Sequence, residues 1–339
     1  MSLLSKKILF NFSASINGGG LKRLEEYSKW FNEVGGSSFI VSSKVVDNLT
    51  LKYPKNRYFI SQQNNLDRLF RDQKYLKDLP LDYTNLELYY SYGIPIYSKI
   101  AKKNWFHISN VAPFAKNINK SIKDYIRNPI LKHRFIRYLD KPDFISTESL
   151  SSFRYLPSKY EHKFVCLLNG SDDEISNFKI NQNTGNYAVA VGTQPYKRID
   201  RVIRCFHFLK EDYGLDKLLI YGCSKKVNRN YFKFKDIKFM GSQPRNSVIK
   251  SIASSKFYIS CTTIENSFNA ASEGIFLSSN SLISDIGPHK ELLMNENKEY
   301  ISINNQKMFL IKKEALKCKN IISWDSVIKI MLTTSGIEI

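Results

Sequence analysis

Short apolar runs alternate along this chain with segments of helical periodicity, and each run ends near a glycine or a small polar residue. In the first half, this pattern predicts strands at residues 7–12, 39–42, 86–90 and 104–108. A helix is predicted directly after Asn17–Gly20, where apolar residues recur at helical spacing: Leu21, Leu24, Tyr27, Trp30 and Phe31. A strand, a glycine turn and a helix in this order open a doubly wound α/β unit.

A second α/β series begins at residue 187. It predicts strands at residues 187–192, 218–222, 238–241, 257–260 and 281–285, with a helix whose apolar face contains Ile199, Val202, Ile203 and Phe206. A polar stretch rich in turn residues separates the two series between residues 168 and 185. We therefore expect two Rossmann-like, doubly wound domains, residues 1–168 and 169–339, facing a central cleft, with a terminal helix that can cross back to the first domain.

The composition fits a packed globular protein, since 42% of the 339 residues are hydrophobic and 13% are aromatic. The five cysteines and five histidines show no CxxC, HxxxH or HExxH spacing, so we expect neither a disulfide framework nor a metal site. The apolar run Ile8–Phe10 after Lys6 and Lys7 is too short for a signal peptide, and no run reaches membrane-spanning length. The expected location is cytoplasmic.

The net charge of +20 has two explanations: a lysine-rich solvated surface, or a polyanionic neighbour such as nucleic acid, nucleotide phosphates or an anionic membrane. Residues 116–137 carry seven basic side chains against the single acid Asp124, with apolar residues interleaved. This pattern predicts a basic amphipathic pair of helices interrupted at Pro129. Such helices either dock on anionic lipid headgroups or are ordinary core-facing helices with a basic outer face.

The most informative polar residues are Glu265 and Glu273, which are separated by seven residues in a segment that reads as a loop turning into a buried helix. Carboxylates are costly to bury without partners. If they accept hydrogen bonds from ligand hydroxyls, the ligand is polyhydroxylated, which indicates a sugar or the ribose of a nucleotide.

Three further segments carry candidate chemistry. The amides of Gly18–Gly20 at a helix start suit an anion, or simply make a tight turn. Lys197 and Arg198 follow a strand and can neutralise a leaving diphosphate, or are solvated helix-start residues. His107 ends an apolar strand, where it can hydrogen-bond a sugar hydroxyl or be a satisfied core residue.

Taken in order along most of the chain, and most densely from residue 187 to 295, these segments resemble the retaining glycosyltransferases of the GT-B fold, group 1 or family 4. The resemblance rests on the Glu265-x7-Glu273 motif and on an ordered series of other segments: Gly18–Gly20, His107, 169–172, Gly192–Lys197, 219–222, 239–242, 284–286 and 323–325.

The resemblance implies roles for individual residues. Lys197 would stabilise the leaving phosphate, Glu265 would contact the donor sugar, and His107 would lie near the transferred sugar. The implied donor-binding residues are Gly19, Gly20, Arg198, Gly222, Ser242, Gln243, Ser267, Phe268, Asn269, Ala270 and Glu273. Of these, Glu273 would contact the ribose, Ser242 and Gln243 would lie near the base, and the glycines and Ser267–Ala270 would present amides to the diphosphate and sugar.

The resemblance also implies a function. We expect a retaining, metal-independent hexosyltransferase that needs no cofactor and moves a sugar from a nucleotide-sugar to an acceptor hydroxyl. A cytoplasmic enzyme with a basic first domain fits a lipid-linked glycan acceptor at the inner membrane face, in the assembly of a bacterial surface polysaccharide such as lipopolysaccharide O-antigen or capsule.

Two alternatives come from the departures and the charge. Thr193 replaces the arginine usual after the strand glycine, Arg198 replaces a glycine, and Asn266–Asn269 replaces Gly-Phe-Gly, which is compatible with a catalytically silent nucleotide-sugar-binding relative. The charge of +20 is compatible with a nucleic-acid-binding protein. No RRM, KH, zinc-finger or basic-zipper pattern appears, however, so no nucleic-acid partner is expected.

Overall fold

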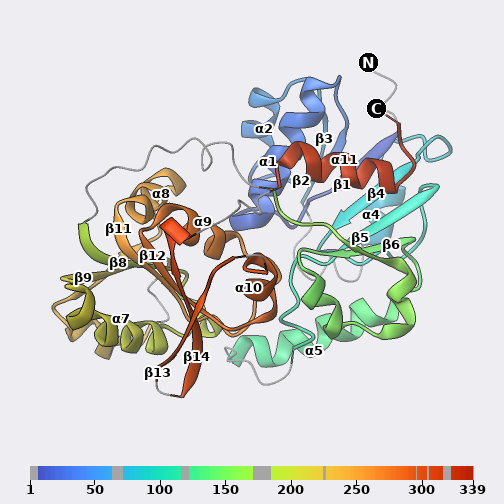
Figure 1. The fold of residues 1–339 in the computed structure, drawn as a ribbon. Coiled ribbons are helices and arrows are strands. Elements are labelled where there is room, and N and C mark those ends of the chain that lie inside the picture. Colours follow the sequence, from blue (N-terminus) through green and yellow to red (C-terminus); the bar gives the residue numbers. More distant parts are fainter. Residues whose placement is uncertain are drawn as a thin grey trace. The chain divides into compact units, whose positions relative to one another are not determined.

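The computed structural model describes residues 7–62, 72–115, 122–170, 185–223, 227–294, 296–303, 305–315 and 322–338 (Figure 1). They form two compact units. The first comprises Met1–Phe114, Ile126–Gly170 and Ile322–Ile339, and the second comprises Ala115–Tyr125 and Ser171–Ile321. Each unit contains a seven-stranded sheet dominated by parallel pairs, which confirms the predicted α/β class.

The first unit holds an entirely parallel sheet of order β3-β2-β1-β4-β5-β6-β7. Its strands are β1 (Ile8–Asn11), β2 (Ser38–Ser42), β3 (Arg57–Ser61), β4 (Leu88–Tyr92), β5 (Lys103–His107), β6 (Phe144–Thr147) and β7 (Phe164–Cys166). Its helices are α1 (Gly18–Glu33), α2 (Val46–Lys52), α4 (Asp72–Lys77), α5 (Ile122–Arg137, from Ile126 onward), η2 (Leu150–Tyr155), η3 (Ser158–Lys163) and α11 (Trp324–Thr334).

Aromatic side chains dominate the core of this unit. Phe10 on β1 lies fully buried, with ring centroids 4.9 Å from both Phe31 of α1 and Phe39 of β2. The terminal helix α11 belongs to the same core, because its buried face of Trp324, Val327, Ile328, Met331 and Leu332 packs into this cluster. Large buried rings contribute much apolar area per residue, so they fix α1 and α11 firmly on the sheet.

The second unit holds a sheet of order β10-β9-β8-β11-β12-β14-β13, parallel except where β14 pairs with β12 and β13. Its strands are β8 (Gly185–Val191), β9 (Lys217–Tyr221), β10 (Ile237–Gly241), β11 (Ser255–Ser260), β12 (Asn280–Ser284), β13 (Glu299–Ile303) and β14 (Gln306–Lys312). Its helices are η4 (Pro195–Lys197), α7 (Ile199–Tyr213), η6 (Arg229–Lys233), α8 (Arg245–Ala253), α9 (Asn269–Leu277), α10 (Gly287–Leu292) and η7 (Lys313–Ala315).

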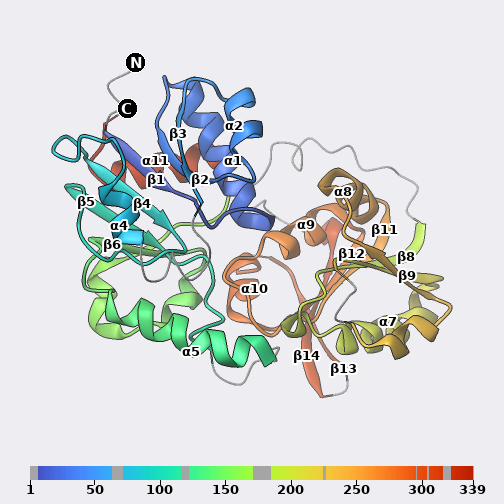
Figure 2. The same cartoon turned by 180° about the vertical axis from the view of Figure 1, so that it is seen from behind.

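Helices cover both faces of the second sheet. Figure 2 shows α7 on one face and α8 and α9 on the other. The buried side chains divide accordingly, with α7 packing against alternate residues of β8, β9 and β11 and the helices α8 and α9 packing against the residues between them. This is the two-sided covering that an apolar parallel strand requires.

The structure confirms the predicted strands and the two helices that begin near residues 18 and 199. Five strands were not predicted: β3, β6, β7, β13 and β14. They are edge or near-edge strands. Polar residues leave only short apolar runs in β3, β6 and β13, whereas β7 and the part of β14 from Met308 to Ile311 are continuous apolar runs that the prediction missed.

The predicted interruption of the basic segment at Pro129 is wrong for the residues that the structure describes. The helix α5 runs continuously through Pro129. A proline removes one backbone donor and is compatible with helical φ, and that single loss does not end this helix. Residues 116–121, including Lys116 and Lys120, lie outside the described residues.

Candidate functional site

The second sheet has a topological switch point between β8 and β11. These strands are neighbours, yet the chain after β8 leads to β9 on one side and the chain after β11 leads to β12 on the other. Connections that diverge in this way leave a crevice at the carboxyl ends of the strands, where open α/β sheets bind ligands. Lys197 follows β8 and Glu265 follows β11, so the topology brings them to the same crevice.

Lys197 and Glu265 form an ion pair between Nζ and Oε1, with side chains that are 14% and 22% exposed. Burial lowers the pKa of Lys197, but the nearby Glu265 carboxylate outweighs it, and the net pKa is raised. Lys197 is therefore a stable cation in a partly dehydrated setting. Such a cation can stabilise negative charge that develops on a neighbouring oxygen.

Gly192 makes room for this lysine. Its φ of +95° lies in the region that favours glycine, and a Cβ there would lie 3.0 Å from Cε of Lys197. The next residue, Thr193, donates its hydroxyl to the carbonyl of Cys223 at 2.6 Å and also adjoins Gly222, at the end of β9. Thr193 thus ties two loops together where the resemblance leads one to expect an arginine.

Arg198 adopts a left-handed conformation, with φ of 52°, which explains why a glycine is usual at this position. Its guanidinium forms an ion pair with Asp200 at 2.6 Å between Nη2 and Oδ2. The structure thus places the charge of Arg198 beside the first turn of α7, and its expected contact with the donor stays a prediction.

The second glutamate of the motif, Glu273, is buried on α9 and pairs with Arg245, the first residue of α8, at 2.7 Å between Oε1 and Nη2. The sequence offered no signal for this partner beyond an arginine at the start of a helix. Ser242 and Gln243 are exposed just before that helix, where the Gln243 amide donates to the carbonyl of Met240 at 2.8 Å. Arg245 therefore holds the Glu273 carboxylate close to the loop that follows β10.

The residues between the two glutamates form the start of α9. The Ser267 hydroxyl accepts a hydrogen bond from the backbone N–H of Asn269 at 3.2 Å and donates to its side-chain oxygen at 2.8 Å. Phe268 occupies the N-cap position without a side-chain cap, and Ala270 lies in the first turn. Amides of a first helical turn suit an anion, and the expected contact of this segment with the diphosphate and sugar stays a prediction.

A buried histidine that sequence reasoning considered only as a metal ligand lies near the ion pair. His289 on α10 donates from Nδ1 to the carbonyl of Ser284 at 2.8 Å. Burial lowers its pKa to about 4, and the opposing charges of Glu265 and Lys197 also act on it. The imidazole is consequently neutral at physiological pH.

The first sheet has its own switch point between β1 and β4, from which the connections lead to β2 and β5. Gly18–Gly20 begin α1, which is the first element after β1 and is joined to it by residues 12–17. A Cβ on Gly20 would lie 3.1 Å from the ring of Tyr92, whereas one on Gly19 would meet nothing within 4 Å. Close packing thus accounts for Gly20, while the expected role of Gly19 at a diphosphate stays a prediction.

His107 ends β5, as predicted, and is fully buried. Its Nδ1 lies 2.8 Å from the Ser146 hydroxyl, its Nε2 lies 3.3 Å from the Glu148 carboxylate, and its ring stacks on Tyr92 at 5.0 Å between centroids. Glu148 was not predicted as a site residue. The available signal was an acid directly after the short apolar run of β6, which sequence reasoning also missed.

Arg23 of α1 organises the rest of this cluster. Its fully buried guanidinium donates to the Tyr90 hydroxyl at 3.0 Å, to Asn169 Oδ1 at 2.9 Å and to the carbonyls of Leu167 and Leu168. The Glu148 carboxylate lies 3.8 Å away. Asn169, which the resemblance placed at the domain junction, is therefore held by a buried cation, while Ser171 and Asp172 lie outside the described residues.

The charges of this cluster can be assigned. Burial raises the pKa of Glu148, but its hydrogen bond with His107 and the charge of Arg23 outweigh that effect, and the net pKa is lowered. Burial and the charge of Arg23 together lower the pKa of His107 to about 4. The cluster consequently contains a cation, a carboxylate and a neutral imidazole.

Within the described ranges, no group of three or more His, Cys, Asp or Glu side chains could hold a metal ion. Over the same ranges, no helix is long and apolar enough to cross a bilayer.

Comparison with known proteins identifies the fold. No protein-family model matches the chain, and no curated protein matches it. Solved structures do match. HepE from Anabaena, solved in complex with UDP and glucose, matches with a TM-score of 0.57 and 14% identity, over 85% of this chain and 83% of HepE.

Two further matches are of the same kind. Sucrose-phosphate synthase from Thermosynechococcus elongatus has a TM-score of 0.59 and 10% identity, over 86% of this chain and 84% of its own. WaaG, a glycosyltransferase involved in lipopolysaccharide biosynthesis, has a TM-score of 0.58 and 11% identity, over 97% of this chain and 90% of WaaG. The chain therefore has the GT-B glycosyltransferase fold, as expected from its sequence.

The two buried neutral histidines predict acid sensitivity. Below the usual histidine pKa of 6.5 the unfolded chain gains protons, whereas folded His107 and His289 stay neutral down to about pH 4. The stability they contribute is complete above pH 6.5 and is lost as the pH falls toward 4. In urea denaturation, the free energy of unfolding should be lower at pH 5 than at pH 7. The expected decrease is about 2 kcal/mol from His107 in the first unit and about 2 kcal/mol from His289 in the second unit.

The variant His289→Asn should be less stable at pH 7 and should lose less stability on acidification. The control His133→Asn, which changes an exposed residue of α5, should keep the full dependence. Equal stability of the wild-type chain at the two pH values would show that these histidines are not buried as neutral groups.

Proposed function

We propose that this chain is a retaining glycosyltransferase that moves a sugar from a nucleotide-sugar to an acceptor hydroxyl and needs neither a metal nor a cofactor. The observation that carries the proposal is the Lys197–Glu265 ion pair at the switch point of a sheet in a GT-B fold. In one crevice, the cation can bind the diphosphate of a nucleotide-sugar, and the carboxylate can accept hydrogen bonds from the sugar hydroxyls. The description of HepE as a complex with UDP and glucose supports this ligand class.

In this proposal the second unit binds the donor. Glu273, held by Arg245, accepts hydrogen bonds from the ribose hydroxyls, and Ser242 and Gln243 lie near the base. Glu265 accepts from hydroxyls of the sugar. The backbone amides at the start of α9, from Ser267 to Ala270, contact the diphosphate.

The first unit is proposed to contact the acceptor, the donor diphosphate and the transferred sugar. Gly19 and Gly20 offer backbone amides to the diphosphate at the start of α1. The neutral ring of His107, oriented by Ser146 and Glu148, is a hydrogen-bonding group without charge. Arg23 is a positioning residue, because its guanidinium is fully buried and donates to Tyr90 and Asn169.

The proposed chemical step breaks the bond between the anomeric carbon and the diphosphate oxygen, and the electron pair stays on that oxygen. Lys197 stabilises the new charge. The acceptor hydroxyl attacks the anomeric carbon from the same face, and its proton passes to the departing phosphate oxygen. The new carbon–oxygen bond thus keeps the original configuration, and a preorganised cation of this kind is worth about 3–4 kcal/mol in the transition state.

Removal of the cation tests the assignment. We expect Lys197→Ala to lower kcat/KM by at least about 100-fold, because the leaving charge loses its partner. Glu265→Ala should also lower kcat/KM, because the sugar is no longer oriented. The donor is first chosen by a thermal-shift screen of UDP-, GDP-, dTDP- and CMP-linked sugars, and turnover is then measured with that donor.

The control is Lys217→Ala, at the amino end of β9 and away from the crevice, which should keep wild-type turnover. Circular dichroism verifies that each variant is folded. Equal turnover in the wild type, Lys197→Ala and Glu265→Ala would refute these roles.

One observation favours a second candidate function, a nucleotide-sugar-binding protein without catalysis. Thr193 replaces an expected arginine, and its hydroxyl is engaged by the carbonyl of Cys223, so it brings no charge to a phosphate. Saturable binding of UDP or GDP without turnover of any donor would support this candidate over the transferase.

We also propose that the acceptor is a lipid-linked glycan at the inner membrane face, in surface-polysaccharide assembly. The helix α5 exposes Ile126 and Ile130, which are 68% and 46% accessible, next to the exposed cations Arg127 and Arg137. Apolar and basic side chains on one exposed helix face suit an anionic membrane surface. The described role of WaaG in lipopolysaccharide biosynthesis is consistent with this setting.

Vesicle flotation tests the membrane proposal. The chain should float with phosphatidylglycerol-containing vesicles at low salt and not with vesicles of phosphatidylcholine alone. Ile126→Ser combined with Ile130→Ser should abolish flotation, while Leu51→Ser, which alters an even more exposed apolar residue on α2, should not. Absence of flotation at low salt, or flotation that survives the double substitution, would rule out this surface.

A further inference from the structure

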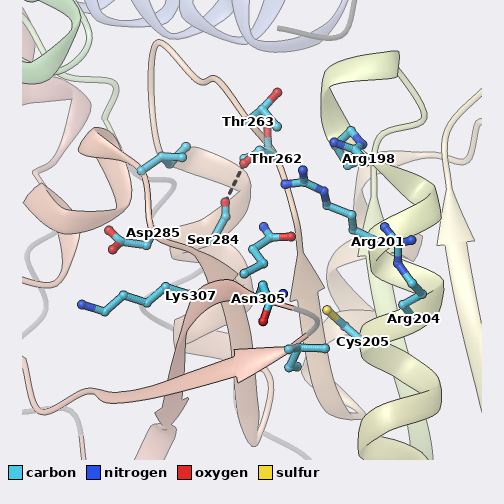
Figure 3. Close-up of a pocket in the computed structure, with 13 residues that line it drawn as sticks. Arg198, Arg201, Arg204, Cys205, Thr262, Thr263, Ser284, Asp285, Asn305 and Lys307 are labelled. Carbon is cyan, nitrogen blue, oxygen red and sulfur yellow. Dashed lines mark hydrogen bonds between the residues drawn. The ribbon is translucent and has the colours of Figure 1, made fainter. Parts of the chain in front are cut away.

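The second unit contains a pocket of about 540 Å³ that neither Lys197 nor Glu265 lines (Figure 3). It lies between α7, the segments that follow β11 and β12, and the turn between β13 and β14. Its polar and charged lining residues are Arg198, Arg201, Arg204, Thr262, Thr263, Ser284, Asp285, Asn305, Gln306 and Lys307. A volume of this size accommodates a small organic ligand.

One wall of the pocket carries a concentration of positive charge. Arg198, Arg201 and Arg204 are three positions apart, so they lie on the same side at the start of α7. The carboxylate of Asp200 serves two of them, at 2.6 Å from Arg198 and 3.1 Å from Arg204. Arg201, between them, has no ion-pair or side-chain hydrogen-bond partner in the part of the chain that the structure describes.

No direct ion pair therefore neutralises the charge of Arg201. Burial and the neighbouring Arg198 lower the pKa of Arg201, and the nearby Asp200 carboxylate, which raises it, does not outweigh them. Figure 3 shows this side chain extending from α7 into the pocket, toward Thr262. A guanidinium in this situation gains stability from an anion that enters the pocket, and its fork of N–H donors matches a phosphate.

The rest of the lining does not cancel this charge. The one carboxylate that lines the pocket, Asp285, already pairs with Lys290 at 2.9 Å. Lys307 adds a further cation, whose Nζ lies 3.9 Å from the ring centroid of Tyr300. The pocket consequently keeps a positive potential.

The wall that faces the arginines also contributes uncharged polar side chains. Asn305, with φ of 61°, lies in the turn between β13 and β14, Gln306 begins β14, and Ser284 ends β12. Carboxamide side chains both donate and accept hydrogen bonds, which suits hydroxyl groups. The pocket thus pairs a phosphate-binding wall with a hydroxyl-binding wall.

We propose that this pocket binds a sugar phosphate, with the phosphate on Arg201 and its neighbour Arg204, and the hydroxyls facing Asn305 and Gln306. The ligand is additional to the nucleotide-sugar proposed above, because the Lys197–Glu265 pair lies outside the pocket lining. Binding here does not depend on transferase activity.

Isothermal titration with glucose 6-phosphate tests the proposal. Inorganic phosphate and glucose, which each represent one part of that ligand, are titrated for comparison. We expect saturable binding of glucose 6-phosphate, weaker binding of phosphate, and none of glucose. Arg201→Gln should weaken binding at least about 10-fold, since it removes a bidentate charged contact. Lys217→Gln removes one positive charge at the far end of the sheet and should leave binding unchanged.

Two further measurements distinguish binding in this pocket from binding in the proposed donor site. Saturating UDP should leave the affinity for glucose 6-phosphate unchanged, and Lys197→Ala should do the same. The proposal is wrong if the wild-type chain shows no saturable binding, if Arg201→Gln binds as well as the wild type, or if UDP or Lys197→Ala abolishes binding. The last result would place the ligand in the donor crevice.

Discussion

The ion pair between Lys197 and Glu265 is the interaction on which the proposed chemistry depends. It exists because β8 and β11 are adjacent while their connections diverge, so two loops 68 residues apart in sequence end in one crevice. The ion pair links the loop after β8 to the loop after β11 and holds both in place. A cation and a carboxylate that are already paired and partly dehydrated need little rearrangement when a charged ligand replaces one partner, and such preorganisation is the main source of electrostatic catalysis.

The first unit uses a buried cation differently. The guanidinium of Arg23 donates hydrogen bonds to Tyr90, Asn169 and two backbone carbonyls, and Glu148 lies close by. This guanidinium is fully buried and is therefore not accessible to a ligand, and its removal would leave a buried carboxylate without its cation. These cations therefore differ in role. Arg23 fixes the crevice at the switch point of its unit, whereas Lys197 and Arg201 present charge that a ligand can use.

The sequence predicted the parts of this account that depend on local pattern. Apolar runs revealed the central strands, and the spacing of Glu265 and Glu273 revealed the segment around α9. The partners of these residues could not be predicted in the same way, because Arg245 meets Glu273, and Glu148 meets His107, only through tertiary contacts. The β13–β14 hairpin supplies Asn305 and Gln306 to the pocket and was not predicted. Polar residues break up β13, and the apolar run of β14 from Met308 to Ile311 is followed by charged residues, not by the glycine or small polar residue that ends the predicted strands.

The most direct test of the central claim is the affinity of the chain for a nucleoside diphosphate, measured by isothermal titration with UDP and GDP. The account predicts one saturable site per chain for at least one of them. It also predicts an affinity at least about 10-fold lower in Lys197→Gln, because a charged contact to phosphate is lost, and an unchanged affinity in Lys217→Gln. Undiminished binding in Lys197→Gln, or no binding of either nucleotide by the wild-type chain, would contradict the claim that this crevice is a donor site.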